Sequence, residues 1–174
     1  MVATLTAPTG RRPVVLVDGG SGAGKTTLAK ALRIAVEPEW GPTQLVSLDD
    51  VYPGWHGLAA ASEAVWRTIL RADNPGHPTW DWVAGEPSGW VAVDPHSPII
   101  VEGCGALSPK SAALATSRLW YERTASERKS RALGRDGETY RPWWDVWSTQ
   151  EEALWAVHRP WELADLIIHG DSPE

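Results

Sequence analysis

Apolar and polar positions divide the chain into short apolar runs that alternate with longer segments of helical spacing. The apolar runs are mostly continuous and rich in β-branched residues, which is typical of strands buried on both faces of a parallel sheet. They predict strands at residues 14–17, 44–48, 98–101, 118–121 and 165–168. The helical spacing predicts helices at residues 25–37, 58–72, 108–116, 126–133 and 144–157. This alternation predicts an α/β fold, a three-layer α/β/α sandwich around a five-stranded parallel sheet.

Two segments depart from the alternation. Residues 1–12 are small, polar and punctuated by Pro and Gly, so we expect a flexible N-terminal segment ahead of a single domain at 13–174. Residues 78–95 are rich in Trp and Gly, and we expect a loop there with a short strand at most. Pro38 is expected to end the first helix. Because ligands of parallel sheets bind beyond the carboxyl ends of the strands, the first candidates for chemistry are the residues that follow Val17, Leu48, Val101 and Tyr121.

The composition of the 174 residues is that of an ordinary globular protein, with 43% hydrophobic and 22% charged residues. A formal net charge of −6 disfavours a nucleic-acid binder, because affinity for a phosphate backbone needs clustered Lys and Arg. A single cysteine, Cys104, excludes an internal disulfide and a zinc site built from cysteines. No apolar run approaches the ~18 residues of a membrane span. We therefore expect a cytoplasmic protein that binds neither nucleic acid nor membrane.

The aromatic residues are unusual, because the chain has 12 Trp and no Phe. One interpretation is that Trp takes the large aromatic positions of the core. The other is that a few of the indoles stack on a flat ligand. Only the position of each Trp in the fold decides between the two.

The segment after the first predicted strand, Gly19-Gly20-Ser21-Gly22-Ala23-Gly24-Lys25-Thr26, fits the phosphate-loop pattern G-x-x-x-x-G-K-[ST], and Thr27 follows it. Its glycines let the backbone wrap closely around phosphates, and the amide hydrogens then point inward at the start of a helix, whose dipole favours anions. Lys25 is expected to reach the β- and γ-phosphates of ATP, and Thr26 to offer its hydroxyl to Mg²⁺. With a buried strand before it and a helix after it, the segment predicts a nucleotide-binding P-loop NTPase fold.

Two acidic positions stand at the ends of predicted strands. Glu102 occupies the place where P-loop proteins hold Mg²⁺ or polarise water. Asp49 is expected to face the phosphate loop from the neighbouring strand, as the base that takes a proton from an acceptor hydroxyl. Asp50 is an alternative base, or a cap of the next turn. The chain has no Asn-Lys-x-Asp segment to read guanine and little room for a motor's extra modules, which favours a kinase.

Three arginines, Arg128, Arg131 and Arg135, are spaced at i, i+3 and i+7 and so share one face of a predicted helix. Guanidinium groups in this arrangement suit a polyanion and can stabilise the charge on a phosphoryl group in transfer. We expect a small helical lid at about residues 126–142, with Arg128 on the nucleotide and the other two arginines closing over the reacting phosphate. The alternative is a solvated basic face that makes weak ion pairs with nearby glutamates.

In this order, the motifs resemble the uridine kinase and phosphoribulokinase-like group of P-loop kinases, and small actinobacterial ATP-binding proteins that are uridine-kinase-like. The resemblance covers most of the chain and rests on the segments 18–27, 47–52 (Ser-Leu-Asp-Asp-Val-Tyr), 78–82 (Pro-Thr-Trp-Asp-Trp), 99–103, 128–136 and 164–170. It implies ATP and Mg²⁺ as cofactors, the role of base for Asp49, and a nucleoside pocket lined by the segment with Trp80 and Asp81. The His and Arg with which uridine kinases hold pyrimidine and sugar are absent, and residues 83–87 stand in their place.

The expected activity is that of an ATP-dependent kinase that transfers the γ-phosphate to a hydroxyl of a small molecule, with a uridine-like nucleoside favoured as the acceptor. One alternative is a kinase for a non-nucleoside metabolite or a nucleoside monophosphate. Another is an ATP-binding regulatory protein without turnover. The chain is expected to be a monomer or homodimer, and the sequence leaves open the acceptor's identity and the choice of ATP over GTP.

The expected site residues form four sets. The nucleotide-binding set is residues 19–27 and Arg128. The catalytic set is Lys25, Asp49, Arg131 and Arg135. The Mg²⁺ set is Thr26, Asp49 and Glu102. The acceptor pocket is expected to hold Tyr52, Trp55, Trp80, Asp81 and Glu102.

Overall fold

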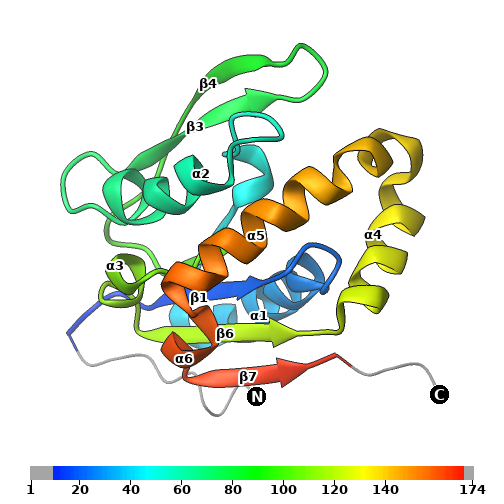
Figure 1. The fold of residues 1–174 in the computed structure, drawn as a ribbon. Helices are drawn as coiled ribbons and strands as arrows, with labels where there is room; N and C mark the ends of the chain where they lie inside the picture. Colours follow the sequence, from blue (N-terminus) through cyan, green and yellow to red (C-terminus); the bar gives the residue numbers. More distant parts are fainter. Residues whose placement is uncertain (1–9, 171–174) are drawn as a thin grey trace.

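The structure, a computed structural model, describes residues 10–170, so residues 1–9 of the segment expected to be flexible lie outside the described residues. A five-stranded parallel sheet forms the centre of the fold (Figure 1). Its strands, in spatial order, are β2 (Gln44–Ser47), β5 (Ile99–Glu102), β1 (Val14–Gly19), β6 (Ser117–Glu122) and β7 (Leu166–His169). The expected α/β fold with five parallel strands is confirmed.

Helices cover both faces of this sheet. They are α1 (Lys25–Trp40), α2 (Leu58–Ala64), α3 (Pro109–Ala112), α4 (Ala125–Tyr140), α5 (Trp144–His158) and α6 (Pro160–Leu163). Short helical turns follow β2 at Leu48–Asp50, α2 at Val65–Ile69 and α4 at Arg141–Trp143. Figure 1 shows α1 behind the sheet, α5 in front of it, and α4 at the end toward which the strands point.

The core explains the continuous apolar runs of the sequence. Every residue of β1 and of β5 is buried, because side chains on both faces of these strands are covered by helices. One cluster joins Val15 and Ile100 to Leu32 of α1. A larger cluster on the other face joins Leu16 to Leu58 of α2 and to aromatic residues of α5. The two clusters make the predicted helix–sheet–helix layers.

Residues 78–95 differ from the loop that the sequence predicts. They belong largely to an antiparallel hairpin of β3 (Gly76–Asp81) and β4 (Glu86–Ala92), with a β-bulge between Thr79 and Trp80. All residues of β4 are exposed, so this strand has no buried face and produces no apolar–polar alternation in the sequence. The hairpin therefore forms where hydrophobic patterning cannot indicate a strand.

Pro38 does not end the first helix, which continues to Trp40. Pro38 lies on the exposed side of the last turn, where water can bind the carbonyl that is left without an amide partner. The fourth helix is also longer than the spacing predicts. It passes residue 133 and reaches Tyr140 across a break at Gly137, whose φ of +55° is one that glycine adopts readily.

A buried aspartate ties the end of β1 to the segment that follows β5. The Asp18 carboxylate accepts hydrogen bonds from the amides of Gly19 (2.6 Å), Gly105 (3.0 Å) and Leu107 (2.8 Å). Burial raises the pKa of Asp18 to about 6, although the amides and the charge of Lys25 act in the opposite direction. Asp18 thus fixes the backbone immediately before the phosphate loop at the cost of a desolvated charge.

The raised pKa of Asp18 predicts a pH dependence of stability. The folded state holds this proton more tightly than the unfolded state, so the contribution of Asp18 is greatest below about pH 4 and is lost as the pH rises through about 6. Relative to Asp18→Asn, which does not titrate, the wild-type free energy of unfolding should fall by about 2 kcal/mol between pH 4.5 and 7.5. Urea unfolding at the two pH values measures this difference. Parallel pH profiles for the two proteins would contradict it.

Candidate active site

The phosphate loop connects β1 to α1 and presents its backbone at the carboxyl end of the sheet. Gly22 and Gly24 have φ angles of +81° and +111°, which glycine adopts and other residues resist. α1 begins at Lys25 with no side chain hydrogen-bonded to its N-terminal amides. The amides of the first helical turn are therefore available to an anion.

Cationic side chains hold four successive carbonyl oxygens of this loop. Lys25 Nζ donates to the carbonyl of Gly20 (3.0 Å), Arg128 to Ser21 (3.3 Å), Arg131 Nε to Gly22 (3.0 Å) and Arg123 Nε to Ala23 (3.2 Å). Hydrogen bonds with a charged partner are stronger than neutral ones, so the loop is held in shape by its surroundings. Two of the four cations, Arg128 and Arg131, come from α4, and Arg123 comes from the segment between β6 and α4.

Lys25 is buried beside a thiol. Its Nζ lies 3.3 Å from the Sγ of Cys104. Burial acts to lower the pKa of Lys25, but the surrounding acidic groups outweigh it and the pKa lies above its ordinary value, so the side chain stays charged. Burial raises the pKa of Cys104 well above its ordinary value, so Cys104 is a protonated thiol.

Oxygen atoms suited to Mg²⁺ meet at the end of β5. Glu102 is 2% exposed, and its Oε1 accepts hydrogen bonds from the hydroxyls of Thr26 (3.0 Å) and Ser47 (2.7 Å). Burial raises the pKa of Glu102, which Lys25 and the hydroxyls partly offset. Hydroxyl and carboxylate oxygens fit a hard cation that keeps several waters and binds phosphate. Ser47 was not predicted, although it ends β2, two residues before Asp49.

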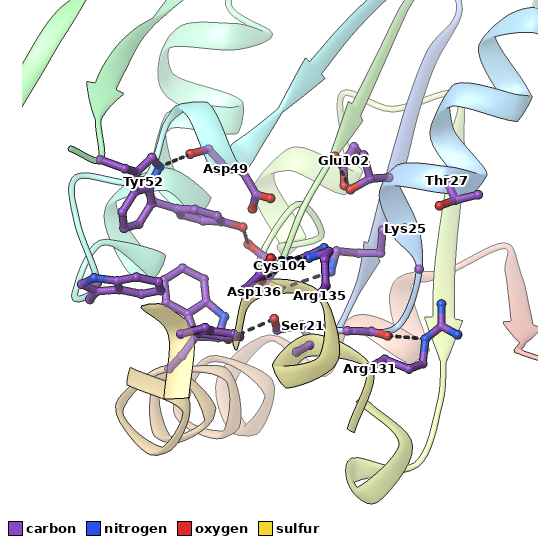
Figure 2. Close-up of a pocket in the computed structure, with 18 residues that line it drawn as sticks. Ser21, Lys25, Thr27, Asp49, Tyr52, Glu102, Cys104, Arg131, Arg135 and Asp136 are labelled. Atoms are coloured by element: carbon purple, nitrogen blue, oxygen red, sulfur yellow. Dashed lines mark hydrogen bonds and ion pairs between the residues drawn. The ribbon is translucent and has the colours of Figure 1, made fainter. Parts of the chain in front are cut away.

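A cavity of about 670 Å³ brings most of the predicted residues together (Figure 2). The predicted residues that line it are Ser21, Gly22, Gly24, Lys25, Thr26, Thr27, Asp49, Tyr52, Trp55, Glu102, Arg131 and Arg135. The Asp49 carboxylate points into this cavity (Figure 2). The strand before it, β2, is separated from β1 by β5, so Asp49 faces the phosphate loop across a strand and not from the neighbouring one.

Trp80 and Asp81 do not line the cavity. The Asp81 carboxylate accepts the amides of Val83 and Ala84 and so closes the turn of the hairpin. Trp80 is partly buried and packs near Gly54. Trp82 lines the cavity instead, and its indole donates to the carbonyl oxygen of Asp49 (2.8 Å).

An aromatic wall, made of Tyr52, Trp55, Trp82, Tyr140 and Trp147, forms one side of the cavity. Trp55 lies at its centre: its ring is stacked on Tyr140 at 5.4 Å between centroids and contacts Trp82 at 4.8 Å. Tyr52 meets Trp147 edge-on at 4.7 Å, and its hydroxyl donates to the carbonyl of Cys104 (2.9 Å). Tyr140 was missed in the sequence, because nothing in its local pattern distinguishes it from a core aromatic.

The three lid arginines on α4 differ in their surroundings. Arg131 and Arg135 line the cavity, and Arg135 is paired with Asp136 (2.7 Å). Arg128 does not line it. Its guanidinium forms a buried ion pair with Glu151 (2.9 Å), a residue that the sequence analysis did not identify. In this structure Arg128 contacts the phosphate loop at the carbonyl of Ser21 and does not face the cavity.

Solved structures of the same fold are kinases with low sequence identity to this chain. A possible uridine kinase from Bacillus stearothermophilus has a TM-score of 0.66 over 95% of this chain and 93% of its own, at 16% identity. A candidate fructose transport system kinase from Silicibacter sp. TM1040 has a TM-score of 0.59 over 95% and 94%, at 18% identity. Shikimate kinase from Acinetobacter baumannii, in complex with shikimate, has 0.53 over 93% and 86%, at 12% identity. No protein-family profile and no curated protein sequence matches the chain significantly.

The chain therefore has the fold of the P-loop kinases, with a phosphate loop at the expected place in it. Its similarity to the fold of the possible uridine kinase agrees with the resemblance that the order of the motifs indicates. Among residues 10–170, no helix is both long and apolar enough to cross a membrane. The same residues contain no cluster of three or more His, Cys, Asp or Glu that could hold a metal ion.

The close packing of α4 on the phosphate loop predicts the effect of a single methyl group. A Cβ at Gly22 would collide with the backbone carbonyl of Arg128 and would strain the left-handed backbone by about 1–2 kcal/mol. We expect Gly22→Ala to displace α4 and abolish binding of an ATP analogue measured by calorimetry. The control is Gly134→Ala on α4, where a Cβ meets nothing within 4 Å and the helix should gain about 0.5–1 kcal/mol. Wild-type affinity in Gly22→Ala would show that the loop tolerates a side chain there.

Proposed function

We propose that this protein is an ATP-dependent kinase that transfers the γ-phosphate to a hydroxyl group of a small molecule. The observation that carries the proposal is that the Asp49 carboxylate and the phosphate loop line one cavity of about 670 Å³. A phosphate site without an opposed base would suit a nucleotide-binding regulator. A base without a phosphate site would suit neither a kinase nor a nucleotide-binding regulator. The P-loop kinase fold of the neighbouring structures supports the same reading.

In the proposed reaction, Lys25 and the amides at the start of α1 hold the phosphates of ATP. Thr26 and Glu102 hold Mg²⁺, which neutralises charge on those phosphates. Asp49 accepts the proton of the acceptor hydroxyl while the acceptor oxygen bonds to the γ-phosphorus. The bond between the γ-phosphorus and the β–γ bridging oxygen breaks, which releases ADP. Arg131 and Arg135 stabilise the charge on the group in transfer.

Asp49 and its neighbour Asp50 provide a matched test of the base. Both are exposed carboxylates in the same turn, but only Asp49 lines the cavity. Asp49→Asn should lower kcat about 10²–10⁴-fold and leave the affinity for ATP nearly unchanged, because it removes proton acceptance and not phosphate contacts. Asp50→Asn should keep wild-type turnover. Steady-state ADP release and calorimetry with a non-hydrolysable ATP analogue measure the two effects. A larger loss in Asp50→Asn would move the role of base to Asp50.

For the acceptor we propose a nucleoside or another molecule with a flat ring. The aromatic wall beside Asp49 supports this, because a planar ring can stack on an indole or phenol face that lines the cavity. The departure from uridine kinases at residues 83–87 means that the base and sugar would be read by other side chains, Trp82 and Trp55 among them. An acceptor panel should include nucleosides, nucleoside monophosphates, fructose and shikimate, since the last two occur in the names of structural neighbours.

Trp55, at the centre of the aromatic wall, tests the class of acceptor. Trp55→Leu should raise the KM of a flat acceptor about tenfold and leave the KM for ATP unchanged, because stacking is lost only on the acceptor side. The control is Trp90→Leu on β4, which is 53% exposed and outside the cavity. Kinetics with the best acceptor of the panel provide the measurement. Equal acceptor KM values in both variants would mean that the acceptor does not stack on Trp55.

A further inference from the structure

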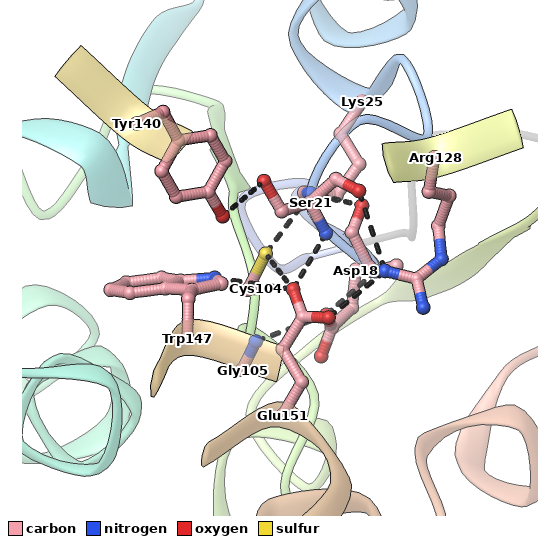
Figure 3. A network of polar contacts seen from close by, with 11 residues as sticks. Asp18, Ser21, Lys25, Cys104, Gly105, Arg128, Tyr140, Trp147 and Glu151 are labelled. Atoms are coloured by element: carbon pink, nitrogen blue, oxygen red, sulfur yellow. Dashed lines mark hydrogen bonds and ion pairs between the residues drawn. The ribbon is translucent and has the colours of Figure 1, made fainter. Parts of the chain in front are cut away.

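A buried carboxylate on α5, that of Glu151, lies next to Ser21 of the phosphate loop (Figure 3). Glu151 is 1% exposed. Its Oε1 accepts hydrogen bonds from the amide of Ser21 (2.6 Å), the thiol of Cys104 (3.2 Å) and the indole of Trp147 (3.2 Å), and its Oε2 accepts from Arg128 (2.9 Å). These partners belong to the phosphate loop, the segment after β5, α5 itself and α4. One side chain therefore joins four parts of the fold at the loop.

Ser21 is consequently held at three of its atoms. Its amide donates to Glu151, its carbonyl accepts from Arg128 (3.3 Å), and its hydroxyl accepts from Tyr140 (3.0 Å). Arg128 and Tyr140 lie in the first and last turns of α4, so both ends of the lid helix contact Ser21. The orientation of the Ser21 peptide is set by α4 and α5 and not by the loop alone.

Glu151 also reaches Lys25 through one intermediate. Cys104 donates its thiol to Glu151, and the same sulfur lies 3.3 Å from Lys25 Nζ. The Glu151 carboxylate thus contacts the loop backbone directly and is connected to Lys25 through Cys104.

We propose that Glu151 is a positioning residue for nucleotide binding, which holds the Ser21 peptide and the lid arginine Arg128 in the arrangement that receives the phosphates of ATP. The inference rests on the proposed function, because it assumes that the loop binds ATP. It adds a residue that touches neither nucleotide nor acceptor and acts through its neighbours. Because its contacts lead mainly to the loop and the lid, its loss should raise the KM for ATP more than the KM for the acceptor.

The test compares Glu151→Gln with Glu152→Gln, the same substitution at the next residue of α5, which is exposed. The probe is a non-hydrolysable ATP analogue with Mg²⁺, titrated into the full chain by calorimetry, with thermal unfolding measured in parallel. The new amide can still accept from Ser21 but presents a neutral group to Arg128. We expect the dissociation constant of the analogue to rise about tenfold or more, while Glu152→Gln keeps the wild-type value.

A double variant separates positioning from stability. Glu151→Gln combined with Arg128→Met leaves no unpaired buried cation and should recover the melting temperature that Glu151→Gln loses. Under the proposal, analogue binding stays weak in this double variant, because the Ser21 peptide and the lid are no longer held by charge. Recovery of binding together with stability would overturn the proposal, because Glu151 would then serve only to neutralise Arg128.

The outcomes also distinguish this inference from the proposed function. Wild-type protein that binds the analogue but phosphorylates no acceptor would overturn the kinase proposal, and the affinities of the variants would still decide the role of Glu151. Wild-type affinity in Glu151→Gln would overturn the inference alone. A wild-type chain that binds no analogue would overturn both.

Discussion

A glycine-rich loop cannot hold its own shape, because its residues have few side chains with which to bind their peptide groups, and this constraint organises the rest of the molecule. The carbonyls of residues 20–23 are each held by a cation, and the carboxylates of Asp18 and Glu151 accept hydrogen bonds from the amides of Gly19 and Ser21. These anchors come from β1, α1, α5 and the region of β6 and α4. The geometry that would receive a phosphate is therefore a property of the assembled fold.

Some of the Trp residues also supply anchoring groups. Trp120 and Trp144 are buried in the core, as the first interpretation of the composition states, whereas Trp55 and Trp82 line the cavity, as the second requires. An indole differs from a phenyl ring in carrying an N–H donor. Trp82 uses it on the carbonyl of Asp49, and Trp147 uses it on Glu151. Phe at either position would fill the space and leave a polar partner without its hydrogen bond.

The fold and the phosphate half of the site could be predicted because their determinants are contiguous in sequence. The five apolar runs, the loop at 19–26 and the carboxylates that end β5 and begin the turn after β2 are each visible in a few consecutive residues. The acceptor half depends on tertiary packing. Trp82 lies in the turn just beyond β3, whose path no strand alternation specifies, so the resemblance pointed to Trp80 instead. Tyr140 and Glu151 act across more than a hundred residues of chain, on Ser21, and no local pattern encodes such a contact.

The hairpin of β3 and β4 has a different relation to the rest of the molecule from that of any strand in the sheet. It pairs only with itself, one of its strands is exposed throughout, and among the contacts described above it reaches the cavity through the indole at its turn. Substitutions on the exposed strand β4 should consequently have little effect on folding. A related protein with the same phosphate loop and a different hairpin would have a different side chain in place of Trp82 at the cavity, on an unchanged sheet.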